Sequence, residues 1–237
     1  LGIRIDTTLA ANAITIDESH RAQALARARK LTGLDNPASP LQLQEWLNQH
    51  GCTIESMAKE SVDDALANAT GQVREALELR QELSRSSVAK YRKMIDVTCT
   101  DQRAHGLLQF YGANRTGRWA GRLVQVQNLP RNYLPDLAQA RGLVRDGNGE
   151  ALDMLYSSVP DTLTQLIRTA FIPSEAHRFI VADYSAIEAR VLAWLAGEET
   201  TLAAFKNGED LYCATASAMF GVPVEKHGVN SELRQKG

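Results

Sequence analysis

Apolar residues recur at helical spacing through the first 95 residues of the chain. From Asp17 the apolar positions repeat every three or four residues, and Gly33 is typical of a residue that ends such a helix. Ser39-Pro40-Leu41-Gln42 is a capping-box pattern with proline at the first helical position, and it predicts a short second helix. A further capping pattern starts at Ser61, and the helical period behind it continues to Met94. The pattern predicts a helical module dominated by one long helix.

Shorter apolar runs bounded by glycine follow this module. Residues 106–112 and 121–127 have the composition and the flanking glycines of short β-strands. Residues 142–150 are rich in Gly, Asp and Asn, so they are predicted to form an exposed loop. A helix is expected to begin at Ser158 or Asp161. Short strands and helices thus alternate in this part of the chain.

A fully apolar run, residues 179–182, comes directly before Asp183. Four apolar residues in a row favour a buried strand. The next helix is expected to run from Ala186 to Ala196, with Gly197 beyond its end. Asp183 would then stand where a buried strand meets a helix. Taken together, the patterns predict an α+β fold, with a helical part followed by an antiparallel sheet and packed helices.

The composition is that of an ordinary globular protein, with 44% hydrophobic and 23% charged residues among 237. No apolar run reaches the roughly 18–20 residues that a membrane span needs. The first ten residues lack the basic and apolar regions of a secretory signal. Cys52, Cys99 and Cys213 stand far apart and form no CxxC pair. That spacing argues against a zinc site or a disulfide scaffold and indicates a reducing, cytoplasmic setting.

The charge is distributed unevenly, although the net charge is only −2. Residues 80–145 hold 12 basic and 4 acidic residues, which gives this stretch +8. The flanks, residues 1–79 and 146–237, carry −4 and −6. A localised phosphate-binding face would produce a basic middle between acidic flanks. A set of solvated helix faces would produce the same pattern, so charge alone leaves both interpretations open.

Asp183 and Glu188 each have two possible roles. A carboxylate held at the end of a rigid strand suits a divalent metal ion, but aspartate is also a preferred helix cap. Ser185-Ala-Ile-Glu188 fits a capping box, so the glutamate could satisfy the helix start. Capping would also fix the glutamate side chain above the strand end, so the two roles are compatible.

Four ordered segments resemble the family A DNA polymerases, with likeness to the phage-type branch. Val181-Ala-Asp-Tyr-Ser-Ala-Ile-Glu-Ala-Arg190 resembles motif A. Arg115-Thr-Gly-Arg-Trp-Ala-Gly-Arg-Leu-Val-Gln-Val-Gln-Asn-Leu-Pro130 resembles the primer–template segment that precedes that motif. Residues 205–223 resemble the stretch leading to the fingers, and residues 231–237 resemble the opening of motif B. The resemblance implies a thumb at residues 1–95, part of a palm at 96–207 and the start of the fingers at 208–237.

The resemblance implies template-directed DNA synthesis from deoxynucleoside triphosphates on primer–template DNA, with two Mg²⁺ ions in the complete enzyme. The expected catalytic residues are Asp183, as a ligand of both metal ions, and Glu188, as the gate that rejects a ribose 2′-hydroxyl. The Tyr184 carbonyl is expected to ligate a metal ion as well. The expected nucleotide-binding residues are Tyr184, Ser185, Ile187, Glu188, Tyr212 and Arg234. The expected DNA-binding residues are Arg85, Lys90, Arg115, Arg118, Gln125, Gln127 and Asn128.

The sequence also departs from the family pattern. Tyr212 stands where bacterial members usually carry a triphosphate-binding histidine, and it brings no positive charge. The His-Asp-Glu of motif C, with its second catalytic carboxylate, is absent from the 237 residues, so these residues alone are expected to be inactive. An alternative is a non-catalytic nucleic-acid-binding module derived from a polymerase, which would need neither Asp183 nor Glu188. A purely structural helical protein would show no salt-dependent DNA binding.

Overall fold

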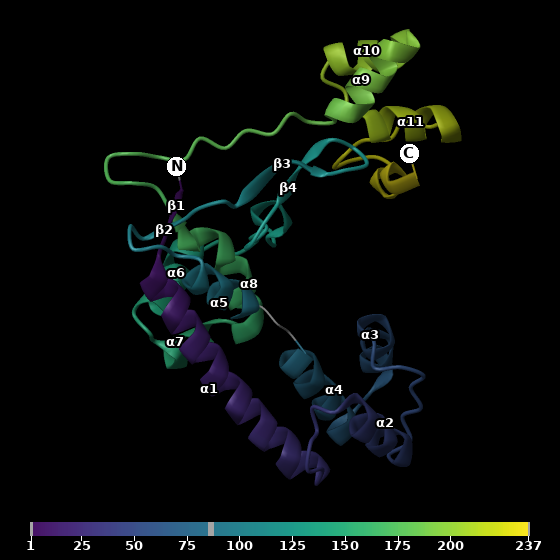
Figure 1. Ribbon diagram of the computed structural model, residues 1–237. Helices are drawn as coiled ribbons and strands as arrows, with labels where there is room; N and C mark the ends of the chain where they lie inside the picture. Colours follow the sequence, from purple (N-terminus) through teal and green to yellow (C-terminus); the bar gives the residue numbers. More distant parts are fainter. Residues whose placement is uncertain (1, 85–87, 237) are drawn as a thin grey trace. The chain divides into compact units, whose positions relative to one another are not determined.

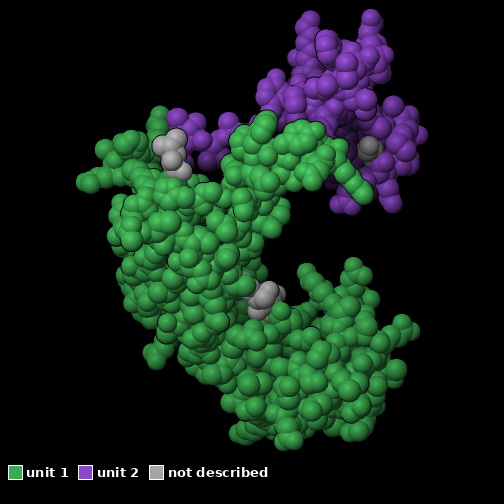
Figure 2. Space-filling model, viewed as in Figure 1, with its two compact units in different colours: residues 1–178 green, residues 179–237 purple. Residues whose placement is uncertain are grey.

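The computed structural model describes residues 2–84 and 88–236, which fall into two units, residues 1–178 and 179–237 (Figures 1 and 2). Helices predominate in both units, and the described strands belong to the first, here called unit 1. These strands pair antiparallel, so the predicted α+β class is confirmed. Within the described ranges, no helix combines the length and the apolar character needed to cross a membrane.

Helix α1 (Thr7–Thr32) is the longest described helix and runs through much of unit 1 (Figure 1). Its N-cap is the buried Asp6 rather than the predicted Asp17, and Asp6 Oδ1 accepts a hydrogen bond from the Leu9 amide at 3.0 Å. Its predicted end is confirmed. Gly33 has a φ of 70° and donates its amide to the Arg29 carbonyl.

Three shorter helices form a module beside the second half of α1. They are α2 (Pro40–Gln49), α3 (Lys59–Asn68) and α4 (Gly71–Ser84), and the start of α2 at Pro40 matches the prediction. The predicted single long helix is wrong, because the chain is extended at Ala69 and has a positive φ at Gly71, which separates α3 from α4. Their apolar faces meet in a cluster made by Leu43, Trp46, Leu47, Ile54, Val62, Ala76 and Leu77.

The larger core of unit 1 lies between the first half of α1 and four other helices. These are α5 (Val88–Asp96), α6 (Leu137–Arg145), α7 (Gly149–Leu155) and α8 (Val159–Leu166). The loop predicted at 142–150 is mostly helical, because Val144 and Leu152 are buried and draw both helices into the core. Asn148 Oδ1 caps α7 by accepting the Ala151 amide at 3.1 Å. The start of α8 after Ser158 confirms the prediction there.

Two small antiparallel sheets complete unit 1. The first has the order β2–β1–β5, from β2 (Arg103–Ala104), β1 (Ile3–Ile5) and β5 (Phe171–Ile172). The second is a hairpin of β3 (Leu108–Ala113) and β4 (Arg118–Gly121). The strand predicted at 121–127 is wrong. The chain turns after Gly121 because Val124 is fully buried, and a short 3₁₀ helix, η1 (Val126–Asn128), follows.

Unit 2 contains three helices and a 3₁₀ segment among its described residues. They are α9 (Ile187–Ala196), α10 (Glu199–Lys206), α11 (Leu211–Phe220) and η3 (Ser231–Lys236). The strand predicted at 179–182 is wrong, since the segment is irregular and Ile180 and Val181 are 84% and 92% exposed. A strand needs a neighbour for its backbone hydrogen bonds, and none of the described residues pairs with this run.

Candidate nucleic-acid interface

The β3–β4 hairpin carries two of the predicted DNA-binding residues. Arg115 lies in the turn of the hairpin, and Arg118 begins β4 opposite Ala113. Both arginine side chains belong to exposed residues. Figure 1 shows the two strands extending away from the helices of unit 1. The hairpin therefore presents guanidinium groups to solvent on a hydrogen-bonded support.

Three more predicted residues meet where α5 packs against the turn after the hairpin. Lys90 Nζ donates a hydrogen bond to the Val124 carbonyl at 2.9 Å. Next to this anchor, Asn128 Nδ2 donates to Gln125 Oε1 at 3.2 Å. The fold thus brings Lys90 together with the Gln125–Asn128 pair, although they are more than 30 residues apart in sequence.

Gln127 is placed by a glycine. A Cβ atom added to Gly121 would overlap the side-chain amide of Gln127, so the amide lies directly over the bare backbone of residue 121. Glycine at 121 is therefore needed for space, and its φ is not in the left-handed region. This places the exposed Gln127 amide against the end of β4.

A groove of about 790 Å³ lies beside this cluster, within unit 1. Figure 2 shows unit 1 hollowed between its helical module and its upper part. Two carboxylates in the groove accept hydrogen bonds from neutral amides. Asp63 accepts one from Gln81, and Asp161 accepts one from Gln165. Neutral amide donors leave both carboxylates negatively charged, so the lining of the groove combines two lysines with two aspartates and several side-chain amides. Its lining comprises Lys59, Asp63, Gln81, Ser84, Lys90, Asn128, Pro130, Asp161, Thr164 and Ile167.

Several arginines of the basic stretch form ion pairs with carboxylates of unit 1. Arg141 and Arg145 both contact the buried carboxylate of Asp6, and Arg92 forms an ion pair with Glu18. These guanidinium groups fix helices to one another, so the +8 of residues 80–145 overstates the charge left for a ligand. Arg85 lies outside the described residues.

Exposed aromatic rings accompany the arginines of the hairpin, and the sequence reasoning missed them. The Phe110 and Trp119 rings meet edge to face, with ring centroids 5.2 Å apart, and the centroid of the Tyr111 ring lies 6.4 Å from that of Phe110. All three are exposed. Two consecutive aromatic residues in a predicted strand were the available signal, because one of them must point away from a core. Aromatic rings beside arginines are suited to stacking on nucleic-acid bases.

In unit 2 the motif A residues Asp183, Tyr184 and Ser185 are exposed in an irregular segment before α9. The predicted capping box is wrong: the N-cap is Ala186, which has a φ of 52° and gives no side-chain hydrogen bond. The segment is held instead by Arg190, whose Nε donates to the Ser185 carbonyl at 2.9 Å. Ile187 and Glu188 occupy the exposed first turn of α9.

The described residues around Asp183 do not form a two-metal site. In the described part of the chain, Asp183 belongs to no group of three or more carboxylate, imidazole or thiol ligands that converge. One carboxylate supplies too few oxygen ligands to hold two divalent ions in reactive geometry. Motif A therefore contributes two exposed carboxylates, Asp183 and Glu188, neither of which belongs to a converging group of three or more ligands among the described residues.

Arg234 and Tyr212 are brought together by a residue that the sequence reasoning missed. Asp210 accepts from Arg234 Nη2 at 2.9 Å, and the guanidinium lies over the Tyr212 ring, 5.1 Å from its centroid. The Arg234 guanidinium holds the pKa of Asp210 below its usual value. Asp210 also caps α11 by accepting the Cys213 amide at 3.2 Å. An aspartate directly before an apolar helical pattern was the signal for this cap.

Comparison with known proteins assigns the chain to a family. The family model described as DNA polymerase family A matches residues 11–237. The chain belongs to DNA polymerase family A. It is 54% identical to the DNA polymerase of Bacillus phage SP02 over all 237 residues, which cover 37% of that protein. The predicted family resemblance is thereby confirmed.

Other family A relatives match shorter stretches. The chain is 51% identical to the thermostable DNA polymerase I of Thermus aquaticus over 63 residues, 27% of this chain and 8% of that protein. The solved POL domain of Pol1 from M. smegmatis, in complex with DNA primer-template and dNTP, matches 99% of the chain at a TM-score of 0.63. The chain covers 38% of that structure at 21% identity, so this likeness concerns the fold.

Proposed function

We propose that the whole protein is a template-directed DNA polymerase and that these residues hold the primer–template duplex and supply part of the nucleotide site. The observation that carries the proposal is the groove in unit 1, where Lys90 and Asn128 line one surface. In this proposal residues 1–95 are the thumb, 96–207 belong to the palm and 208–237 begin the fingers. The free cysteines agree with a cytoplasmic location.

Unit 1 would bind duplex DNA by two kinds of contact. Lys90, Arg115 and Arg85 would contact phosphates, which makes binding depend on salt. Arg118, Gln125, Gln127 and Asn128 would contact base edges in the minor groove. Acceptors there occupy similar places in all correct base pairs, so these side chains would test pair geometry rather than read sequence.

Unit 2 would take part in nucleotide selection. Asp183 and the Tyr184 carbonyl would provide ligands for Mg²⁺, which when bound neutralises charge on the transferred phosphoryl group. Glu188 would reject a ribose 2′-hydroxyl, with Ser185 and Ile187 beside it. Arg234 and Tyr212 would meet the triphosphate, for which Arg234 must exchange its Asp210 partner for phosphate oxygens.

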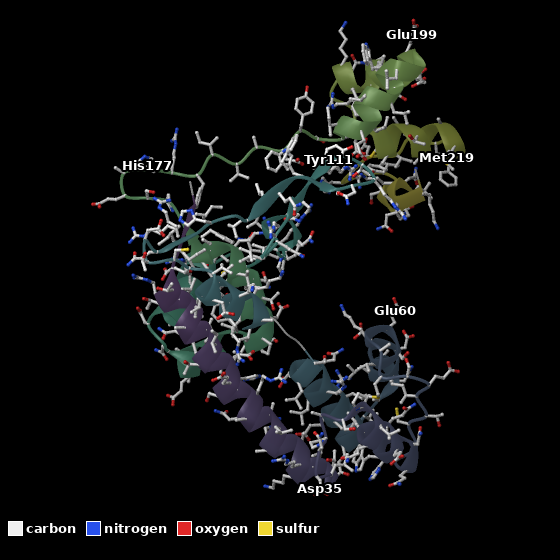
Figure 3. All side chains as sticks on the ribbon, in the orientation of Figure 1. Asp35, Glu60, Tyr111, His177, Glu199 and Met219 are labelled. Carbon is white, nitrogen blue, oxygen red and sulfur yellow. The ribbon has the colours of Figure 1, made fainter. Side chains whose placement is uncertain are left out.

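The DNA-binding part is tested by fluorescence anisotropy of the chain with a labelled primer–template duplex. We expect Arg118→Ala to weaken binding by about 1–3 kcal/mol, the loss typical of one good base contact. The matched control is Arg29→Ala, because Arg29 bonds the Asp35 carbonyl at the far end of α1 (Figure 3). Equal affinities of the two variants would overturn this assignment of the interface.

The isolated stretch itself would act as a binding module, and the exposed Asp183, which belongs to no converging group of three or more ligands among the described residues, favours this second function. We expect the 237-residue chain to show no primer extension with Mg²⁺ and dNTPs, because among its described residues Asp183 belongs to no converging group of three or more metal ligands. A primer-extension assay on a gel checks this. Extension that is abolished by Asp183→Ala would show that the chain alone is catalytic.

A further inference from the structure

Cys99, Asp101 and His105 form a compact group on unit 1. Their Sγ, carboxylate oxygen and imidazole nitrogen lie within 4.8 Å of one another, and all three residues are exposed. The group surrounds the turn between α5 and β2, in the spacing Cys-x-Asp-x-x-x-His. Sequence reasoning considered only cysteine pairs, whereas the fold combines one cysteine with two other ligand types.

Backbone hydrogen bonds hold this turn in shape. The Cys99 amide donates to the Arg103 carbonyl at 2.9 Å, and the Gln102 amide donates to the Cys99 carbonyl at 2.9 Å. Asp101 Oδ1 accepts the Arg103 amide at 3.1 Å, which leaves Oδ2 on the side of His105. The ligand-bearing residues are therefore placed before any ion arrives, which lowers the cost of binding one.

The His105 ring is also restricted. Its Nε2 lies 2.8 Å from Asp101 Oδ2, and the ring covers Gly2, where an added Cβ would lie 2.7 Å from His105 Cε1. Strand β1 places Gly2 there, because Ile3 pairs with Ala104. Glycine at position 2 thus makes room for the imidazole beside the carboxylate.

We propose that Cys99, Asp101 and His105 bind one Zn²⁺ ion. Thiolate, imidazole and carboxylate are the three ligand types that zinc takes in proteins, whereas Mg²⁺ and Ca²⁺ prefer oxygen ligands alone. Three protein ligands leave the fourth tetrahedral position to water, which suits a solvent-exposed turn. The ion would clamp the segment between α5 and β2. The proposal is independent of the polymerase function and of Asp183.

The test is zinc binding by the reduced, metal-free 237-residue chain, measured by competition with a chromophoric chelator. We expect one zinc ion per chain, and Cys99→Ser and His105→Gln should each weaken binding at least roughly tenfold, the lower end of losses seen for outer-sphere partners. Cys52→Ser is the matched control, because Cys52 is a free cysteine in the helical module with His50 nearby. Co²⁺ in place of zinc should show thiolate-to-cobalt charge-transfer absorption that Cys99→Ser removes.

Asp101→Asn separates coordination from the turn. Asparagine keeps an oxygen for the Arg103 amide but is a weaker zinc ligand, so we expect reduced zinc affinity with unchanged far-ultraviolet circular dichroism. Absence of saturable zinc binding, or equal binding by Cys99→Ser and the parent, would overturn the proposal. The three residues would then form only an ion pair of Asp101 with His105, beside a Cys99 thiol that donates to the Val97 carbonyl.

Discussion

Units 1 and 2 differ in how they bury their apolar side chains. Unit 1 has a large core in which Leu9, Tyr91 and Leu163 are fully buried, besides smaller apolar clusters. The described residues of unit 2 form one small cluster around Cys213, Ala216 and Val224, with Leu233 packed against it. Its larger apolar side chains, such as Val181, Trp194 and Leu195, remain exposed.

The difference shows that a recognisable motif need not be a self-sufficient structure. Motif A is among the most characteristic parts of the sequence, but its apolar run has no pairing strand among the described residues. The primer–template segment, by contrast, is anchored by Val124 in a core that unit 1 makes by itself. The described residues of unit 2 leave the apolar run before Asp183 unpaired and exposed.

Paired leucine substitutions test this comparison with the largest expected effect. Leu163→Ala in unit 1 should lower the free energy of unfolding by about 2–5 kcal/mol, because it leaves a cavity in a close-packed core. Leu192→Ala in unit 2, at a residue 68% exposed, should change it by less than about 0.5 kcal/mol. Urea denaturation followed by circular dichroism measures both. Similar losses would mean that the two units are equally well packed.

The same contrast explains which features the sequence predicts. Local signals sufficed at Gly33, at Pro40 and at Ser158, because caps and turn residues act within a few positions. They failed at residues 142–150, where buried Val144 outweighs a loop-like composition, and at 179–182, where a strand needs a partner from elsewhere.

The candidate sites follow the same logic. The meeting of Lys90 with Val124, and of Arg234 with Asp210, depends on the path of the whole chain, so spacing alone did not reveal either contact. The residue types of the nucleotide and DNA sites were available from the resemblance. The partners of these residues within the fold could be identified only from the structure. These partners determine how much charge remains for a ligand.

A substitution at Gly121 tests whether unit 1 by itself positions Gln127 in the proposed DNA interface. An alanine Cβ would displace the Gln127 amide, while the backbone conformation at 121 accepts any residue. We expect Gly121→Ala to weaken primer–template binding by about 0.5–1.5 kcal/mol, the worth of one hydrogen bond, with little change in unfolding free energy. Gln127→Ala is the comparison in the anisotropy assay. If Gly121→Ala has no effect while Gln127→Ala weakens binding, the glycine does not position the amide.

The smallest expected effect concerns the connection that His20 makes between helices α1, α4 and α7 of unit 1. His20 of α1 has Nε2 at 3.5 Å from Glu82 of α4 and Nδ1 at 3.9 Å from Asp153 of α7, with Asp17 also nearby. The Glu82 carboxylate raises the pKa of His20, with smaller contributions in the same direction from Asp153 and Asp17.

Because the folded pKa of His20 lies above the ordinary 6.5, its stabilisation is complete below that value and is lost as pH rises through the folded pKa. Urea unfolding should therefore show a shallow fall in stability above pH 6.5 that His20→Gln removes. Burial raises the pKa of Asp17 above its usual 3.8, so its own contribution falls as pH rises from 3.8 through that raised value. A pH profile that His20→Gln leaves unchanged would show that other groups govern the connection.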